Sequence, residues 1–356
     1  MNENIQFFLP GPTHVAAPVR QAMDAPDIGH RSQAYKDLHA SVSQQLPELF
    51  QTKRDVVPLA GSATLAMEMA VASLVEKDVL HLVCGAFSGR WAKVGAALGK
   101  DADRVEVPWG QVVDPDLVRQ ALKRKKYEAV TVVHNETSTG VLNPLAEISQ
   151  VVHEESDALI CVDTVSSMAG SPVLTDEWGL DYVLTGSQKA LSLPPGMSFF
   201  CPSERAEKKA AEVTHRGFYT DMLSWLSKHR DDLALTTPPI PQLRAADVVL
   251  QRIHAEGLEA RWQRHRDLRA RTEAWAADRG CVYASAPEGA SPTVSCLRPP
   301  EGVVAPDLVK SLAEAGWTVG GGYGKWKPET FRIGHMGEVQ MKDLEALLAV
   351  IDERLQ

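Results

Sequence analysis

The chain has 356 residues, of which 44% are hydrophobic, and a formal charge of -9 at pH 7. This length predicts about two domains with a sizeable apolar core. The excess of acidic over basic residues argues against a nucleic-acid-binding surface, because phosphate contacts need clustered lysine and arginine. The five cysteines are odd in number and far apart, which suggests neither a disulfide framework nor a metal site. No apolar run approaches the roughly 20 residues that span a bilayer, and the N-terminus lacks a signal-peptide pattern. We therefore expect a cytoplasmic protein that binds no membrane.

Apolar runs and helical patterns alternate through the first two thirds of the chain. Residues 7–18 are rich in proline and glycine and predict an extended arm. Helices are expected at 33–50, 65–75, 88–98, 114–126 and 144–155, and strands at 56–60, 79–84, 104–107, 129–134, 158–162, 182–185 and 198–201. Continuous Val, Ile and Leu strands that alternate with helices are typical of a parallel sheet covered on both faces.

The last third has a different pattern. Helices are expected at 204–211, 219–228 and 243–278, with an interruption near Gly257, and a proline-rich break lies at 236–241. Shorter strands follow at 282–284, 293–297, 317–319 and 331–333, with helices at 306–315 and 340–354. The predicted fold is α/β, with an arm at 1–18, a large domain with a mostly parallel sheet at 19–255 and a small C-terminal α/β domain at 256–356.

Ligands of a parallel α/β sheet bind at the carboxyl ends of the strands, so the residues after each strand are informative. Ser62, Ala63 and Thr64 open a helix after the first strand, where free backbone N–H groups favour a phosphate. An ordinary helix N-cap explains the same residues equally well. The GxxxxGK[ST] pattern is missing, which argues against a nucleoside triphosphate. Phe87 follows the second strand, where its ring could stack on a flat ligand.

Three further strand ends carry polar side chains. Thr137 lies in a run of small hydroxyls, and Asp163 ends an apolar run with Val165 on the same side by strand period. Lys189 follows the strand at 182–185, and burial there would lower its pKa from about 10.4 so that the neutral amine can attack a carbonyl. A lone lysine after a strand is usually a solvated charge. The argument for a site therefore depends on the residues taken together.

The combined strand ends supply a phosphate cradle, a stacking ring, a hydroxyl, a carboxylate and a lysine. Pyridoxal phosphate needs this set. The carboxylate keeps the pyridine nitrogen protonated, and the lysine forms a Schiff base and then carries a proton. The sequence therefore predicts pyridoxal phosphate as the cofactor and no metal.

Over nearly its whole length the sequence resembles the class V, fold-type I pyridoxal-phosphate aminotransferases, and among them the alanine–glyoxylate and serine–pyruvate aminotransferase group. The matching stretches include ETSTGVL at 136–142, GSQKAL at 186–191 and FRIG at 331–334, and the GSQKAL and ETSTG segments are highly specific in combination. The resemblance implies a fold-type I transferase and a homodimer with a shared active site.

The resemblance also implies roles for the residues around the cofactor. Lys189 would form the Schiff base, Asp163 would pair with the pyridine nitrogen and Val165 would press on one face of the ring. Gln188 and the backbone after Ser62 would hold the phosphate.

Four further positions match the family pattern or depart from it. Thr137 would hydrogen-bond near the ring oxygen, and Phe87 stands where relatives often carry tryptophan. Thr237 matches a phosphate contact lent across the dimer interface, although the tyrosine that commonly precedes it is replaced by Ala234. Arg332 would clamp the substrate carboxylate with two parallel hydrogen bonds.

The expected activity moves an amino group from a small L-amino acid, alanine or serine, to a short 2-oxo acid, glyoxylate or pyruvate. Alternatives on the same scaffold are an aspartate or phosphonate transaminase and a cysteine desulfurase or lyase. A non-catalytic ligand-binding relative is a further alternative. A nicotinamide dehydrogenase is disfavoured, because no GxGxxG follows the first strand. The roles of His30 and Arg31, on the loop before the helix at 33–50, stay open.

Overall fold

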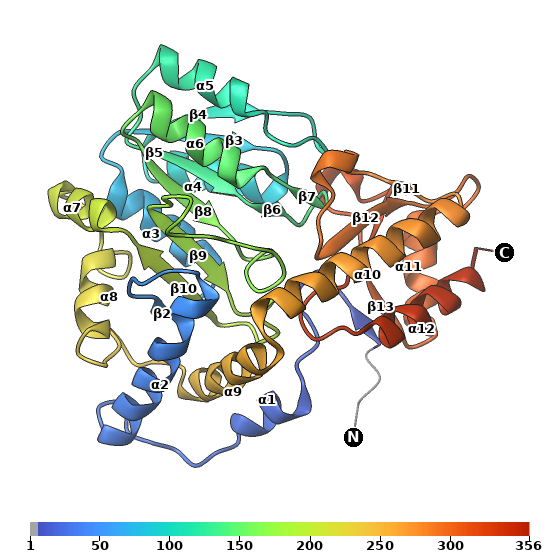
Figure 1. Cartoon of the computed structure of the whole chain (residues 1–356), viewed down its shortest axis with the longest axis horizontal. Coiled ribbons are helices and arrows are strands. Elements are labelled where there is room, and N and C mark those ends of the chain that lie inside the picture. Colours follow the sequence, from blue (N-terminus) through green and yellow to red (C-terminus); the bar gives the residue numbers. More distant parts are fainter. Residues whose placement is uncertain (1–5, 356) are drawn as a thin grey trace.

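The computed structural model describes residues 6–355 and contains two main sheets, a larger one flanked by helices and a smaller one toward the C-terminus (Figure 1). A two-stranded piece, β6 (Asn135–Glu136) with β7 (Val141–Leu142), lies at one edge of the larger half. In the part of the chain that the structure describes, no helix is both long enough and apolar enough to cross a membrane.

The larger sheet has seven strands in the order β2-β10-β9-β8-β5-β3-β4. Their bounds are β2 Val57–Ala60, β3 Asp78–Val83, β4 Asp101–Glu106, β5 Ala129–Val133, β8 Leu159–Asp163, β9 Tyr182–Gly186 and β10 Met197–Pro202. The four adjacent pairs from β9 to β4 are parallel, which confirms the expected mostly parallel sheet.

Strand β10 is the exception, because it runs antiparallel to both β2 and β9. The connection from β9 to β10 spans only residues 187–196 and contains no helix. A parallel crossover needs roughly a dozen residues or more. The short connection, which carries Lys189, therefore reverses the direction of the chain.

Helices cover both faces of the larger sheet. They are α2 Gln33–Leu49, α3 Ala63–Leu74, α4 Ala86–Ala97, α5 Pro115–Arg124, α6 Leu145–Glu155, α7 Glu204–Glu212, α8 Met222–His229 and α9 Ile240–Glu256. Alternate residues of β5 belong to different apolar clusters, with Val130 and Val132 in one and Ala129 and Val133 in the other. The strand is buried on both sides, which explains its continuous apolar sequence.

The smaller sheet has the order β1-β13-β14-β12-β11. Its strands are β1 Phe7–Phe8, β11 Val282–Tyr283, β12 Val294–Arg298, β13 Thr318–Gly321 and β14 Phe331–Gly334. Helices α10 Leu258–Asp278, α11 Ala305–Glu314 and α12 Met341–Asp352 supply its apolar cover. Figure 1 shows α10 running from the larger half of the molecule across the smaller sheet.

The N-terminal arm connects the two halves. Its strand β1 pairs parallel with β13 at the edge of the smaller sheet. The arm then passes the β9–β10 connection at 187–196, here called the lysine loop because it carries Lys189. There the N–H of Thr13 donates to the carbonyl of Gln188 at 3.0 Å. A Cβ on Gly11 would lie 2.6 Å from Cγ of Lys189, so only glycine fits there. Helix α1 (Ala17–Ala22) begins inside the segment expected to be extended.

The division into an arm, a large domain and a small domain, with boundaries at residues 18 and 255, remains a prediction. Helix α9 ends at Glu256 and α10 begins at Leu258, separated by Gly257 with a positive φ of 82°. Leu258 and Trp262 of α10 nevertheless pack in an apolar cluster of the larger sheet. The first turns of α10 therefore contribute to the core of the preceding half.

Replacing Phe8 with alanine should lower the free energy of unfolding by about 3–5 kcal/mol, because a fully buried aromatic ring would leave a cavity. Phe8 is 0% exposed and stacks on Trp317 with ring centroids 6.2 Å apart. Chemical denaturation followed by circular dichroism measures the change. Phe218→Ala is the control, since that ring is 73% exposed. Equal effects of the two substitutions would show that β1 does not anchor the arm.

Candidate active site

A cavity of about 260 Å³ lies at the carboxyl ends of the central strands. Nine of the residues predicted from the sequence line it: Ser62, Ala63, Thr64, Phe87, Thr137, Asp163, Val165, Gln188 and Lys189. These residues follow five different strands, and the parallel arrangement brings them together at one edge of the sheet.

The end of the cavity near α3 is built to receive an anion. Ser62 precedes the first turn of α3, and its side chain makes no capping hydrogen bond. The N–H groups at the start of the helix have no intrahelical acceptor and point outward with the positive end of the helix dipole. A Cβ on Gly186 would lie 2.9 Å from Oε1 of Gln188 and 3.2 Å from Cβ of Ala63. The end of β9 therefore packs directly against this cradle.

Lys189 is held inside the cavity with its side chain buried. Its Nζ donates to Oγ1 of Thr137 at 2.6 Å and to Oγ of Ser166 at 3.1 Å, and it lies 4.6 Å from the centroid of the Phe87 ring. The residue is 8% exposed. Burial lowers the pKa of the amine to about 8, against the opposing attraction of Asp163. The structure thus provides the desolvated amine that the sequence predicted.

Asp163 ends β8 and is buried beside the same cavity. Its Oδ1 accepts a hydrogen bond from the N–H of Val165 at 2.8 Å, and its other oxygen accepts none from the described residues. Burial raises the pKa of the carboxyl group, while the N–H of Val165 and the charge of Lys189 lower it. A cationic ring nitrogen in this cavity would replace the hydration that the carboxylate has lost.

Arg332 of β14 reaches the edge of this space from the smaller sheet. Its Nε donates to the carbonyl of Gly321 at 2.9 Å, and NH1 donates to the carbonyl of Thr137 at 3.1 Å. NH2 has no hydrogen-bond partner among the described residues, so one edge of the planar group stays available for a carboxylate. Burial lowers the pKa of Arg332 from its usual value. Arg332 does not line the cavity itself, although Thr137 contacts both Arg332 and Lys189.

The class-V aminotransferase family model matches residues 17–335. An uncharacterized aminotransferase of Methanocaldococcus jannaschii is 37% identical over 98% of this chain and 92% of its own length. The L-aspartate–glyoxylate aminotransferase of Paracoccus denitrificans is 32% identical over 95% of this chain and 88% of its own. The crystal structure of an alanine–glyoxylate aminotransferase from Nostoc sp. has a TM-score of 0.94 at 30% identity, covering 100% of this chain and 96% of that one.

The chain belongs to the class-V aminotransferases. It is therefore a pyridoxal-phosphate-dependent aminotransferase with the fold-type I architecture. The cavity fits this cofactor at three points: an anion cradle at α3, a buried carboxylate with a free oxygen, and a desolvated amine. In the described part of the chain, no group of three or more His, Cys, Asp or Glu is arranged to hold a metal ion.

Thr237 is the predicted cofactor residue that this aminotransferase does not place in the cavity. It is exposed and lines a second pocket of about 410 Å³, together with His30, Arg31 and Lys228. Within one chain this pocket is separate from the residues around Lys189. The predicted role of Thr237 therefore requires another subunit.

Sequence reasoning missed the role of Glu136, which is 0% exposed. Its carboxylate accepts hydrogen bonds from the backbone N–H groups of Phe87, Ser88 and Ser138 and from both serine hydroxyls. A Cβ on Gly85 would lie only 2.4 Å from Cγ of Glu136. The carboxylate thus sits at the N-terminus of α4, which favours its negative charge, and fixes the backbone that presents the Phe87 ring.

Three other polar residues of the cavity were also missed: Arg90, Asn135 and Ser166. The guanidinium of Arg90 lies 4.9 Å from the centroid of the Phe87 ring, one helical turn further along α4. Asn135 directly follows the strand expected at 129–134, and Ser166 directly follows Val165. Extending each strand-end segment by one turn would have included all three.

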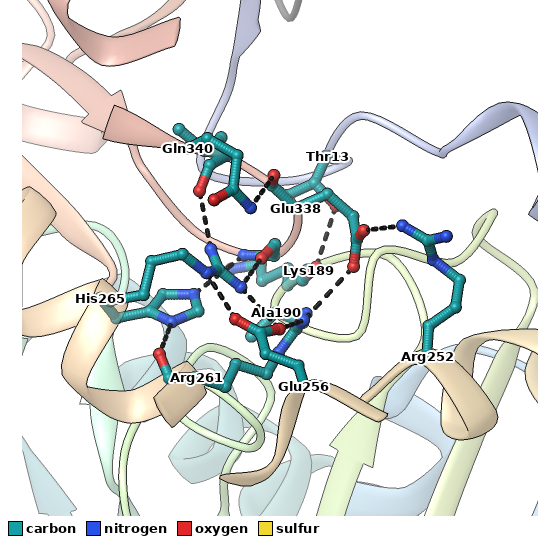
Figure 2. Close-up of polar contacts among 12 residues, drawn as sticks. Thr13, Lys189, Ala190, Arg252, Glu256, Arg261, His265, Glu338 and Gln340 are labelled. Atoms are coloured by element: carbon teal, nitrogen blue, oxygen red, sulfur yellow. Dashed lines mark hydrogen bonds and ion pairs between the residues drawn. The ribbon is translucent and has the colours of Figure 1, made fainter. Parts of the chain in front are cut away.

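A network of charged side chains contacts the backbone of the lysine loop (Figure 2). The buried Arg261 donates to the carbonyl of Ala190 at 3.3 Å and to Glu256 at 2.7 Å, and forms a salt bridge with Glu338 at 3.3 Å. The hydroxyl of Thr13 donates to the carbonyl of Lys189 at 2.9 Å. The arm, α10 and the loop after β14 therefore all converge on the same short loop.

The rate at which the cofactor-free protein binds pyridoxal phosphate covalently should rise with pH up to about 8 and then level off. Only the neutral amine attacks the aldehyde, and burial lowers the pKa of Lys189 to about 8. Below that pH the neutral fraction falls about tenfold per unit. Stopped-flow absorbance at pH 6–10 measures the rate. A rate that still increases steeply above pH 10 would mean that the amine is solvated.

Replacing Glu136 with alanine should lower the free energy of unfolding by about 2–3 kcal/mol, because buried donors would lose a charged acceptor. It should also weaken cofactor binding, because the start of α4 loses its anchor. Thermal unfolding and cofactor titration measure the two effects. Glu259→Ala is the control, since Glu259 is 78% exposed in its ion pair with Arg266, and its effect should stay within about 0.5 kcal/mol. Similar behaviour of the two variants would contradict the anchoring role.

Proposed function

We propose that this aminotransferase moves an amino group from a small L-amino acid, alanine or serine, to a short 2-oxo acid, glyoxylate or pyruvate. One observation carries the proposal. Thr137 contacts the buried amine of Lys189 through its hydroxyl and the buried guanidinium of Arg332 through its carbonyl. An amine that can move a proton and a guanidinium that can bind a carboxylate therefore border the same small space, as an α-amino acid requires.

The residues divide the work of the reaction between them. Pyridoxal phosphate supplies the aldehyde and a ring that accepts the electron pair released at the α-carbon of the substrate. Asp163 would hold a proton on the ring nitrogen, and Phe87 would cover the ring. Lys189, oriented by Thr137 and Ser166, would take the proton from the α-carbon of the donor and deliver it to the former aldehyde carbon of the cofactor. In the second half of the reaction the same amine would move a proton in the opposite direction, to the α-carbon of the acceptor. Arg332 holds the carboxylate that donor and acceptor have in common.

Glyoxylate as an acceptor is supported by the names of two relatives, an alanine–glyoxylate and an L-aspartate–glyoxylate aminotransferase. Aspartate is the alternative donor. The second carboxylate of aspartate needs a further cation, and Arg90 lies in the cofactor cavity rather than beside Arg332. We therefore favour the donors with short uncharged side chains.

A homodimer in the cytoplasm is part of the proposal. His30, Arg31 and Thr237 form a polar pocket that contains no catalytic residue of its own chain, so a second subunit could use these residues to complete its phosphate site. All five cysteines are free thiols, as expected in a reducing compartment.

A cysteine desulfurase is disfavoured by the state of the thiols. Cys281 and Cys296 are buried, and burial raises the pKa of each thiol to about 11. A nucleophilic cysteine needs a lowered pKa and access to substrate. Neither residue meets this requirement.

Lys189→Ala should reduce kcat by about 10²- to 10⁴-fold, because the proton carrier is lost. Arg332→Ala should instead raise the KM of both substrates by about 10- to 100-fold, because charged hydrogen bonds to the carboxylate are removed, while the cofactor stays bound. Alanine–glyoxylate kinetics and the visible absorbance of the bound cofactor separate the two effects. The control is Arg266→Ala, an exposed arginine of α10. Normal turnover by Lys189→Ala would refute the proposed reaction.

A further inference from the structure

Tyr323 lies on the loop between β13 and β14, at the border of the space between Phe87 and Arg332. Its ring centroid is 5.3 Å from that of Phe87, with an interplanar angle of 38°. The guanidinium carbon of Arg332 lies 5.5 Å from the same Tyr323 ring. Its hydroxyl makes no hydrogen bond to the described part of the chain. One aromatic ring thus contacts both the cofactor-covering ring and the carboxylate clamp.

The loop holds Tyr323 in this position through close contacts on both sides. A Cβ on Gly322 would lie 2.3 Å from the carbonyl oxygen of Trp326, and one on Gly324 would lie 2.8 Å from the ring of Trp109. Gly324 also has a positive φ of 51°. The rings of Trp109 and Trp326 pack edge to face with centroids 5.7 Å apart. These contacts anchor the loop to the larger half of the molecule. The position of the Tyr323 ring is therefore fixed by the loop as well as by the contacts of the ring itself.

The position of a bound amino acid follows from its two ends. Its carboxylate binds Arg332, and its nitrogen lies near Lys189, whose Nζ is 4.6 Å from the centroid of the Phe87 ring. Thr137 lies between Lys189 and Arg332 and is hydrogen-bonded to both. Phe87 and Tyr323 occupy another side, as neighbours in direct contact. Of the two rings, Tyr323 contacts Arg332, so a side chain on the α-carbon that extends toward these rings lies beside Tyr323.

We infer that the ring of Tyr323 is the wall of the side-chain subsite and limits the amino donor to a side chain of one carbon, with or without a hydroxyl. This inference rests on the proposed transamination and specifies its substrate class. The ring, rather than its hydroxyl, sets the limit. Each methylene added to the donor should therefore lower kcat/KM, and removal of the ring should relieve that loss.

The test compares L-alanine, L-2-aminobutyrate and L-norvaline as donors to glyoxylate, using the holoenzyme. In Tyr323→Ala the ratio of kcat/KM for norvaline to that for alanine should rise at least tenfold over the wild type, since one methylene in an apolar pocket is worth about 10- to 200-fold. The ratio cancels any general loss caused by a displaced Arg332. Tyr323→Leu provides a second variant with milder truncation and should raise the ratio by a smaller factor.

Two controls separate the ring from other effects. Tyr323→Phe keeps the ring and should keep the wild-type ratio. Tyr127→Ala removes a tyrosine that contacts Asp103 and Lys125, away from the cavity, and should also leave the ratio unchanged. An unchanged ratio in both Tyr323→Ala and Tyr323→Leu, or a raised ratio in Tyr323→Phe, would overturn the inference while transamination stands. A wild-type enzyme that transaminates neither these three donors nor L-serine would refute the proposed function, and this inference with it.

Discussion

Burial of the Lys189 amine among compensating charges is the condition on which the site depends. A buried cation is costly unless it is paired or becomes neutral. Here Asp163 and Glu136 favour the charged amine, while burial, Arg332 and Arg90 disfavour it. The carboxylate of Glu136 itself accepts hydrogen bonds from five donors at the N-terminus of α4. The amine is consequently neither a solvated charge nor a permanently paired one, and a proton can leave it and return to it.

That electrostatic balance requires both halves of the molecule. The larger sheet supplies Asp163 and Lys189 at parallel strand ends, and β14 of the smaller sheet supplies Arg332. The N-terminal arm and Arg261 then hold the lysine backbone from two further directions (Figure 2). Ser192, in the same loop, has a positive φ of 54°, and a Cβ on Gly337 would lie 1.9 Å from its hydroxyl. The loop is therefore fixed by tertiary contacts more than by its own conformational preference.

The sequence predicted the features that local pattern determines. Continuous apolar runs identified the buried strands, and the residues after them included nine members of the cavity. It did not predict features that depend on distant partners. Arg332 and Thr137 are 195 positions apart, and Glu136 and Ser88 are 48 apart, so no local period connects either pair. The edge strand β1 was similarly hidden, because two phenylalanines in a proline-rich arm have no strand period of their own. Thr237, predicted from family resemblance, lies outside the cavity of its own chain.

Thr137 explains why one clamp can serve two substrates. Its hydroxyl binds the reacting amine and its own carbonyl binds the guanidinium, so the separation of the two groups is constrained by the covalent geometry of a single buried residue. Donor and acceptor both carry a carboxylate one carbon away from the nitrogen or oxygen that is exchanged. A fixed separation therefore suits both, and it disfavours compounds in which an extra carbon intervenes. Under the proposed function, the recognition of an α-substituted acid is thus built into the backbone, whereas the length of its side chain is left to the walls around it.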